Sequence, residues 1–191
     1  MPPIAAKKTP AKKRRKGHGK GQSFEREVSR RLSLWLTKGA RDDVFWRTAM
    51  SGGRATLQAK KGIINFAQAG DIGAIDPLGA QLLNHVTIEC KFYRDLVLFK
   101  SLLQGTGKIA GFWEKHYDEA RLSQREPFMI ARENLTPTLL LTTKNATHLL
   151  GIRSRPVMEV FGWHPRSRIG SSVLVFLFDK VVPTLKHWRE E

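Results

Sequence analysis

The residues best suited to chemistry lie in one stretch, Gly70 to Lys91, which reads GDIGAIDPLGAQLLNHVTIECK. It places Asp71 at the start of one apolar run and the Glu89-Cys90-Lys91 triplet at the end of another. Carboxylate oxygens are ligands that Mg²⁺ takes, together with waters and phosphate oxygens. Such a metal lowers the pKa of bound water, and a nearby lysine ammonium adds a compact positive charge. The stretch therefore predicts a site at which a bound metal ion would activate water to hydrolyse a phosphate ester.

A β-hairpin is the local structure that we expect to hold these groups together. Residues 71–75 would form a short first strand, and Asp76-Pro77-Leu78-Gly79 fits a turn with proline at its second position. Residues 85–92 alternate, so that His85, Thr87, Glu89 and Lys91 share one face of a second strand. Glu89 and Lys91 are then neighbours, roughly 7 Å apart along the strand.

Asp76 is the alternative acid in this stretch. It opens the predicted turn, where an aspartate has a structural role, so we favour Asp71 as the metal ligand. A lone Asp or a lone Glu-x-Lys is a common surface pattern. Here Asp71 and the Glu-x-Lys pattern occur together, next to apolar strands in a basic protein, and this combination indicates a catalytic site.

Charge indicates the partner. The chain has 191 residues, with 33 Lys and Arg against 17 Asp and Glu, a net charge of +16. Clustered cations bind phosphate backbones by displacing counterions, so nucleic acid is the expected ligand, with an anionic membrane as the competitor. The first 22 residues contain no acid and suit a disordered arm that binds nucleic acid, although a solvated tail or a nuclear-import patch has the same composition. The cations of its densest part are Lys12, Lys13, Arg14, Arg15 and Lys16.

Several classes are excluded or disfavoured by composition. Cys90 is the single cysteine, so neither an internal disulfide nor a cysteine-based zinc site is expected. No run of eighteen apolar residues is present and the N-terminus lacks an apolar signal core, so we expect a cytoplasmic protein with no membrane-spanning helix, and no membrane as its partner. His116, His148, His164 and His187 lack ligand spacing and suit core or surface positions.

Two elements upstream must position the site. A helix is expected over residues 23–37, with Ser23 as N-cap and a buried stripe formed by Phe24, Val28, Leu32, Trp35 and Leu36. Glu25 lies beside that stripe, either as the salt-bridge partner of a nearby arginine or as a member of the site. A β-prone run over residues 44–48 leads into a Ser-Gly-Gly loop whose amides could approach a phosphate. The polar members of this region are Arg47, Ser51 and Arg54, and Lys60 and Lys61 follow in a loop.

The remaining pattern gives the fold class. Helices are expected near residues 99–103 and 108–124, and buried strands near 128–132, 138–143 and 171–178. This alternation predicts an α/β fold, a mixed central sheet flanked by helices. We expect a single domain over residues 23–191 behind the basic tail.

These residues resemble the PD-(D/E)xK nucleases, and within them the Holliday-junction resolvase-like members of archaea and phages. The matching residues are Gly70-Asp71, in place of Pro-Asp, and Glu89-Cys90-Lys91. The similarity extends upstream to the segment GKGQSFERE, which makes Glu25 a candidate metal ligand, and to Arg47, Ser51 and Gly52. It covers roughly residues 20–93. The basic insert over 55–69 is longer than in a minimal resolvase, and the region after Arg153 has no counterpart.

The resemblance implies a restriction-endonuclease-like core and hydrolysis of DNA that depends on Mg²⁺, with Mn²⁺ as a possible substitute. Asp71, Glu89 and Glu25 would hold the metal and Lys91 would assist the water. The substrate would be branched or duplex DNA, and a homodimer would cut a junction symmetrically. A non-catalytic nucleic-acid-binding protein, or a nuclease of the same fold with another DNA or RNA substrate, remains open on the sequence alone.

Overall fold

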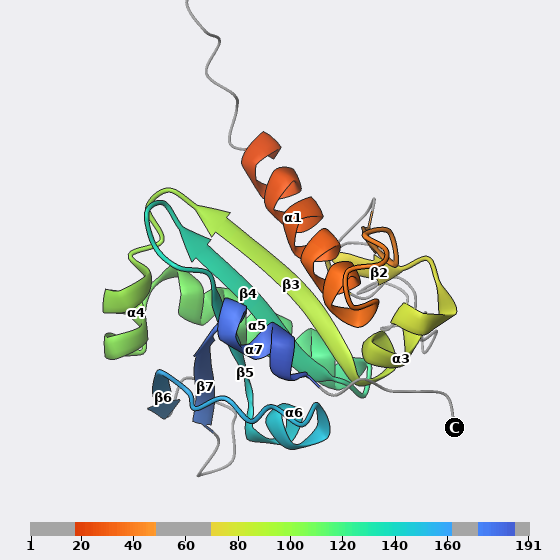
Figure 1. The fold of residues 1–191 in the computed structure, drawn as a ribbon. Helices are drawn as coiled ribbons and strands as arrows, with labels where there is room; N and C mark the ends of the chain where they lie inside the picture. Colours follow the sequence, from red (N-terminus) through yellow and green to blue (C-terminus); the bar gives the residue numbers. More distant parts are fainter. Residues whose placement is uncertain (1–17, 49–69, 162–171, 186–191) are drawn as a thin grey trace, which may run out of the picture.

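The fold is known from a computed structural model, which describes residues 18–48, 70–161 and 172–185. Its centre is a mixed five-stranded sheet with helices on both faces (Figure 1). The strand order is β3-β4-β5-β7-β6, and a separate two-stranded ribbon joins β1 to β2. The predicted α/β class is confirmed, with a restriction-endonuclease-like arrangement of sheet and helices.

Burial distinguishes the central strands of the sheet from its edge strands. The central strands β4 (Glu126–Glu133), β5 (Leu139–Thr143) and β7 (Ser172–Leu177) are apolar on both faces, as expected for a sheet covered by helices. β3 (Val86–Tyr93) pairs with β4 in parallel and is an edge strand, while the other pairs are antiparallel. The strand β6 (Met158–Phe161), which the sequence pattern did not indicate, forms the opposite edge. The ribbon consists of β1 (Phe45–Arg47) and β2 (Ile72–Ala74).

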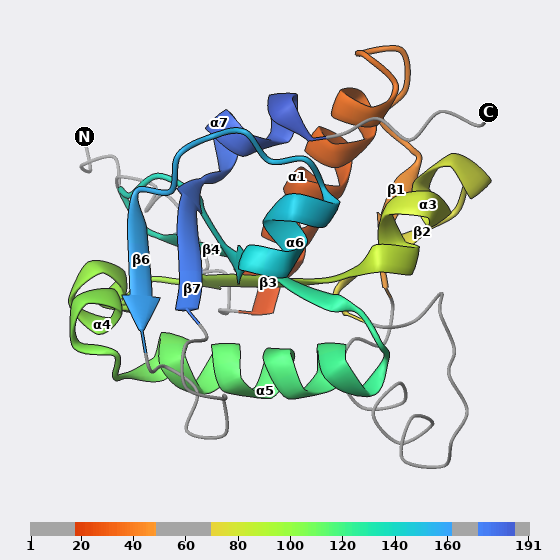
Figure 2. The same cartoon turned by 90° about the horizontal axis from the view of Figure 1, so that it is seen from below.

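Helices cover the two faces of this sheet. α1 (His18–Leu36) lies along one face with α7 (Phe178–Val181), and α5 (Lys108–Leu122) runs across the other (Figure 2). α4 (Leu98–Gln104) packs with α5, and α6 (Lys144–Leu149) follows β5. The short α3 (Pro77–His85) leads directly into β3, and a 3₁₀ turn over Val182–Thr184 ends the described part.

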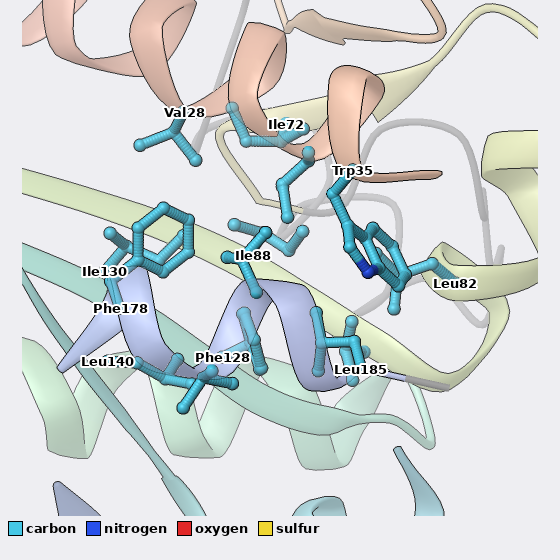
Figure 3. Close-up of a cluster of buried hydrophobic side chains, with 14 of the residues drawn as sticks. Val28, Trp35, Ile72, Leu82, Ile88, Phe128, Ile130, Leu140, Phe178 and Leu185 are labelled. Atoms are coloured by element: carbon cyan, nitrogen blue, oxygen red, sulfur yellow. The ribbon is translucent and has the colours of Figure 1, made fainter. Parts of the chain in front are cut away.

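Two apolar clusters, one on each face, hold these layers together. The cluster under α1 joins Val28 of the helix to Ile72 of β2 and Ile88 of β3 (Figure 3). The predicted stripe of α1 is buried here, with Phe24, Val28 and Leu32 at most 1% exposed. The second cluster joins α4 and α5 to the opposite face of the sheet through Leu102, Ile109 and Trp113. The first cluster therefore packs both β2 and β3 against α1.

The predicted hairpin is wrong. Asp76-Pro77 does not open a turn but starts the helix α3, with Asp76 as N-cap and Pro77 in the first turn. The Asp76 side chain accepts a hydrogen bond from the Leu78 amide at 2.9 Å. Aspartate at the N-cap followed by proline is also a helix-start signal, and the Leu82 and Leu83 side chains, which are buried, favour the helix over the turn. As a result, β2 pairs with β1, and the residue two positions before β2, Gly70, forms an isolated parallel bridge with Ile88 of β3.

The start of α1 also differs from expectation. The helix already includes His18, so Ser23 is an exposed interior residue and not an N-cap, and residues 18–22 are helical where a tail was predicted. Packing explains this extension: the Lys20 ammonium lies 5.7 Å from the centre of the Phe92 ring, an interaction that favours continued helix despite Gly19 and Gly21. No helix in the described part of the chain is long and apolar enough to cross a bilayer.

Candidate active site

Asp71 is held at the edge of β3 by the backbone. Its amide donates to the Ile88 carbonyl at 2.7 Å, and its Oδ2 accepts from the Cys90 amide at 2.8 Å. The residue is 4% exposed. These bonds place the Asp71 carboxylate against the centre of the Glu89-Cys90-Lys91 triplet, although the two segments do not form the hairpin expected from sequence.

Gly70 makes that approach possible. Its φ of +86° lies in the left-handed region, and a Cβ built on it would meet the Ile88 carbonyl oxygen at 2.5 Å. A proline, whose φ is near −65°, could not take this conformation. The departure from the Pro-Asp pattern therefore has a structural cause: glycine lets the chain cross β3 closely enough to dock Asp71.

Glu89 and Lys91 lie on the same face of β3, as their spacing predicts, and form a direct ion pair through Glu89 Oε1 and Lys91 Nζ. Both side chains are largely buried, at 16% and 19% exposed. Burial alone would lower the pKa of Lys91, but the charges of Glu89 and Asp71 and the hydrogen bond to Glu89 outweigh it and raise that pKa. Lys91 is thus a fixed cation next to both carboxylates.

Glu25 of α1 is paired with Arg47 of β1. Arg47 Nε donates to Glu25 Oε2 at 2.7 Å, and the Glu25 side chain is 13% exposed. This is the salt-bridge alternative that the sequence left open for Glu25. Arg47, predicted to contact nucleic acid, here bonds a carboxylate across the space between α1 and the β1–β2 ribbon.

A second ionic contact fixes α1 over the sheet. Arg132 of β4 donates to both carboxylate oxygens of Glu27, at 2.8 and 2.7 Å. Its guanidinium carbon also lies 4.5 Å from the Phe24 ring centre and 4.6 Å from that of Phe92. Because Glu27 and Phe24 flank Glu25 on the same helix, this contact sets where Glu25 sits relative to β3.

The charges of the three predicted carboxylates all act on Cys90. Burial and then the charges of Asp71, Glu89 and Glu25 raise the pKa of the Cys90 thiol well above its ordinary value. Within the ranges that the structure describes, no three His, Cys, Asp or Glu side chains form a ready metal-binding group. Mg²⁺, however, usually takes only one or two carboxylates beside waters and phosphate, and Asp71 with Glu89 offers hard oxygens of that kind. The donor set fits such an ion.

Asp76 has a different role from Asp71, Glu89 and Glu25. Its carboxylate caps α3 and pairs with Arg41, whose Nη1 lies 2.6 Å from Asp76 Oδ2. The Leu78 amide, followed by Arg41, holds the pKa of Asp76 below its usual value. Both contacts are structural, which agrees with the reason for favouring Asp71.

The described part of the chain covers only some of the predicted contacts to nucleic acid. Of these residues, Arg47 is described, whereas Ser51, Arg54, Lys60, Lys61 and the cations at positions 12–16 lie outside the described residues. His116 is in the core, as expected, with Nε2 within 3.1 Å of the Thr87 carbonyl oxygen and 3.3 Å of the Phe128 nitrogen.

Two features of the site were missed from sequence. The Cys90 amide, which fixes Asp71, carries no side-chain signal at all. Tyr93 continues the face of Glu89 and Lys91 and stacks on Phe112, and the period-two alternation of β3 could have found it.

One comparison with known proteins gives a match. A family model described as "Phage putative PDDEXK endonuclease" matches residues 16–186. Comparison with curated proteins and with solved structures gave no significant match. The matched range contains Glu25, Asp71, Glu89 and Lys91 together with the whole described fold. The chain therefore belongs to the phage PD-(D/E)xK endonuclease family.

Proposed function

We propose that the protein is a metal-dependent DNA endonuclease that selects branched DNA and hydrolyses its phosphodiester bonds. One observation supports this most: the Cys90 amide holds the Asp71 carboxylate beside the Glu89–Lys91 ion pair. Two carboxylates and a fixed ammonium at a sheet edge suit hydrolysis of a phosphate ester. The net charge of +16 suits a polyanionic substrate.

Each residue has a distinct part in this proposal. Asp71 and Glu89 would hold Mg²⁺, or Mn²⁺ in its place, with their carboxylate oxygens. Such an ion, when bound, makes water a stronger nucleophile and offsets charge on the phosphate. Lys91 would orient the attacking water and stabilise negative charge on the phosphate oxygens, a role that its raised pKa favours because the ammonium stays protonated at neutral pH.

Glu25 would complete the site from α1. Its ion pair with Arg47 holds this carboxylate, whose side chain is 13% exposed, in a fixed orientation in the free protein. We propose that a DNA phosphate competes with Glu25 for Arg47, so that substrate frees the carboxylate to turn toward the metal. Arg47 would then contact the phosphate, as the sequence predicted.

Several basic segments would contribute to DNA binding. We propose that Ser51, Arg54, Lys60, Lys61 and the cations at positions 12–16 contact phosphates, adding affinity that does not depend on base sequence. A two-fold dimer would let two sites cut opposite strands of a junction. Light scattering of the protein, alone and on a four-way junction, tests this oligomeric state.

The test of the proposal is cleavage of a substrate panel. Plain duplex, single-stranded, flap and four-way junction DNA are incubated with Mg²⁺, with Mn²⁺ and with EDTA. We expect cutting near the branch of junctions or flaps, faster than in plain duplex, and none in EDTA. Glu89→Gln and Lys91→Ala should slow cleavage on the order of 100-fold or more while retaining binding.

The rival is a non-catalytic DNA-binding protein. It predicts that no substrate is cut with either metal, and that Glu89→Gln changes binding alone. Equal cutting of plain duplex and of junctions would instead refute the structure selectivity while leaving the nuclease in place.

A further inference from the structure

An aromatic pair borders the candidate site on the α5 side of β3. Tyr93 lies two residues beyond Lys91 on the same strand face, and its ring stacks on Phe112 of α5 with centroids 5.4 Å apart and planes 19° apart. The same Phe112 ring lies 5.4 Å from Lys91 Nζ. Lys91, Phe112 and Tyr93 therefore form one continuous contact, which begins at the ion pair with Glu89 and ends in solvent.

The Tyr93 ring is accessible. Tyr93 is 41% exposed although one side of its ring is stacked on Phe112. A ring supported on one side and open on the other is the geometry of a stacking platform.

Cations flank this platform. Lys108 and Lys115 stand four residues before and three residues after Phe112, so the three share one side of α5, and both lysines are exposed. Arg94, which follows Tyr93, has a side chain that is 70% exposed. Aromatic rings between cations are the pattern by which proteins bind unpaired strands, the cations taking phosphates and the rings taking bases.

We propose that Tyr93 stacks on an unpaired nucleobase next to the scissile phosphate at the site of Asp71, Glu89 and Lys91, and so determines the specificity of the site. In a duplex each base is stacked on its neighbours, and its flat face cannot reach Tyr93. At a branch point or in a single-stranded arm a base can leave the stack at low cost. The platform thus favours a strand that is unpaired beside the scissile phosphate. This inference rests on the proposed function and names its substrate class.

The test measures binding without cleavage. The full chain is titrated in EDTA with forked DNA, a duplex ending in two single-stranded arms, in which an abasic site replaces one base at a time around the fork. We expect one or two positions at which loss of the base weakens wild-type binding about tenfold. Tyr93→Leu should bind intact fork about tenfold more weakly and lose nothing further at those positions, whereas Tyr93→Phe should match the wild type.

Control variants separate the loss of base stacking from a general loss of folding or of DNA binding. Phe161→Leu changes an aromatic residue that is 69% exposed at the opposite edge of the sheet, and should behave as wild type. If Tyr93→Leu melts early, Tyr93→Met, whose flexible thioether can still pack on Phe112, takes its place. The proposal is overturned if no abasic position weakens wild-type binding more than twofold, or if the Leu or Met variant keeps the full abasic loss. Because no cleavage is measured, this outcome is independent of whether the protein proves to be a nuclease.

Discussion

The carboxylate of Asp71 accepts a hydrogen bond from the amide of Cys90, at 2.8 Å. The bond joins the residue just before β2 to the middle of the Glu89-Cys90-Lys91 triplet on β3. Asp71 precedes Glu89 by 18 residues in the sequence, yet this bond holds it beside the Glu89–Lys91 pair. The donor is a backbone amide, so no substitution of the Cys90 side chain removes it. The site thus depends on how closely the segment before β2 approaches β3.

Gly70→Ala should disrupt the site. The new Cβ would meet the Ile88 carbonyl oxygen at 2.5 Å in a backbone conformation of φ +86°. We expect a loss of about 1–3 kcal/mol in the free energy of unfolding and a large loss of cleavage, because Asp71 moves with Gly70. Gly111→Ala is the matched control: that glycine is in α5 with nothing within 4 Å of the added Cβ, and the change should stabilise by about 1 kcal/mol. Equal stability of the two variants in urea titrations would argue against the close approach.

Glu25 and Arg47 should be coupled. Arg47→Gln leaves a carboxylate that is 13% exposed without its cation, and we expect it to cost about 1–3 kcal/mol of folding stability. In a double-mutant cycle with Glu25→Gln, the double variant should lose clearly less than the sum of the single losses. The Arg94–Asp95 pair, at 70% and 82% exposed, serves as the control and should show almost no coupling. Additivity within about 0.5 kcal/mol for Glu25 and Arg47 would contradict the ion pair.

Arg132 should stabilise the docking of α1. Arg132→Ala removes both hydrogen bonds to Glu27 and the contacts with the Phe24 and Phe92 rings. The expected loss is about 1–3 kcal/mol in chemical denaturation. Arg30→Ala removes a single ion pair with Asp42 in which both side chains are more than half exposed, and should cost under about 1 kcal/mol. Equal losses for the two substitutions would show that Arg132 does not contribute to the docking of α1.

His116 should make stability depend on pH. It is 2% exposed, and burial, which outweighs the hydrogen bond to Thr87 and the charge of Asp71, lowers its pKa from 6.5 to about 4. The unfolded chain therefore binds the proton more readily than the folded protein. The stability that neutral His116 contributes to the folded state is fully present above pH 6.5 and is lost as the pH falls toward 4. The loss amounts to roughly 2–3 kcal/mol by pH 4.5.

The measurement is denaturant unfolding of wild type and His116→Gln at pH 7 and pH 4.5. Carboxylates also titrate in this range, so the comparison between the two proteins isolates the histidine. The variant should lose less stability than wild type between the two pH values. An identical loss in both proteins would show that His116 does not titrate as its burial requires.

The sequence predicted the parts of the site that follow from strand alternation. Glu89 and Lys91 share a face of β3 because side chains alternate along any strand, and the stripe of α1 is buried because its apolar residues recur at helical spacing. The mixed α/β class followed from the same two periods. These features depend on local pattern, which the sequence carries directly.

The parts that failed depend on tertiary contacts. Asp76-Pro77 suits both a turn and a helix start, and only the burial of Leu82 and Leu83 selects α3. The beginning of α1 at His18 depends on Lys20 meeting Phe92, which is 72 positions away. The pairing of Glu25 with Arg47 likewise depends on how α1 lies against β1, so the sequence could offer it only as one of two alternatives.

Cleavage by Asp71→Asn, compared with cleavage by Asp76→Asn, tests the central claim most directly. Both changes remove one negative charge from acids five residues apart, and binding of each variant to the same DNA is measured alongside. With Mg²⁺, we predict that Asp71→Asn binds like wild type but cuts on the order of 100-fold more slowly or worse. Asp76→Asn, which alters only the cap of α3 and the contact with Arg41, should cut at nearly the wild-type rate at temperatures where it is folded. Wild-type cleavage by Asp71→Asn, or loss of cleavage in folded Asp76→Asn alone, would contradict the site described for this nuclease.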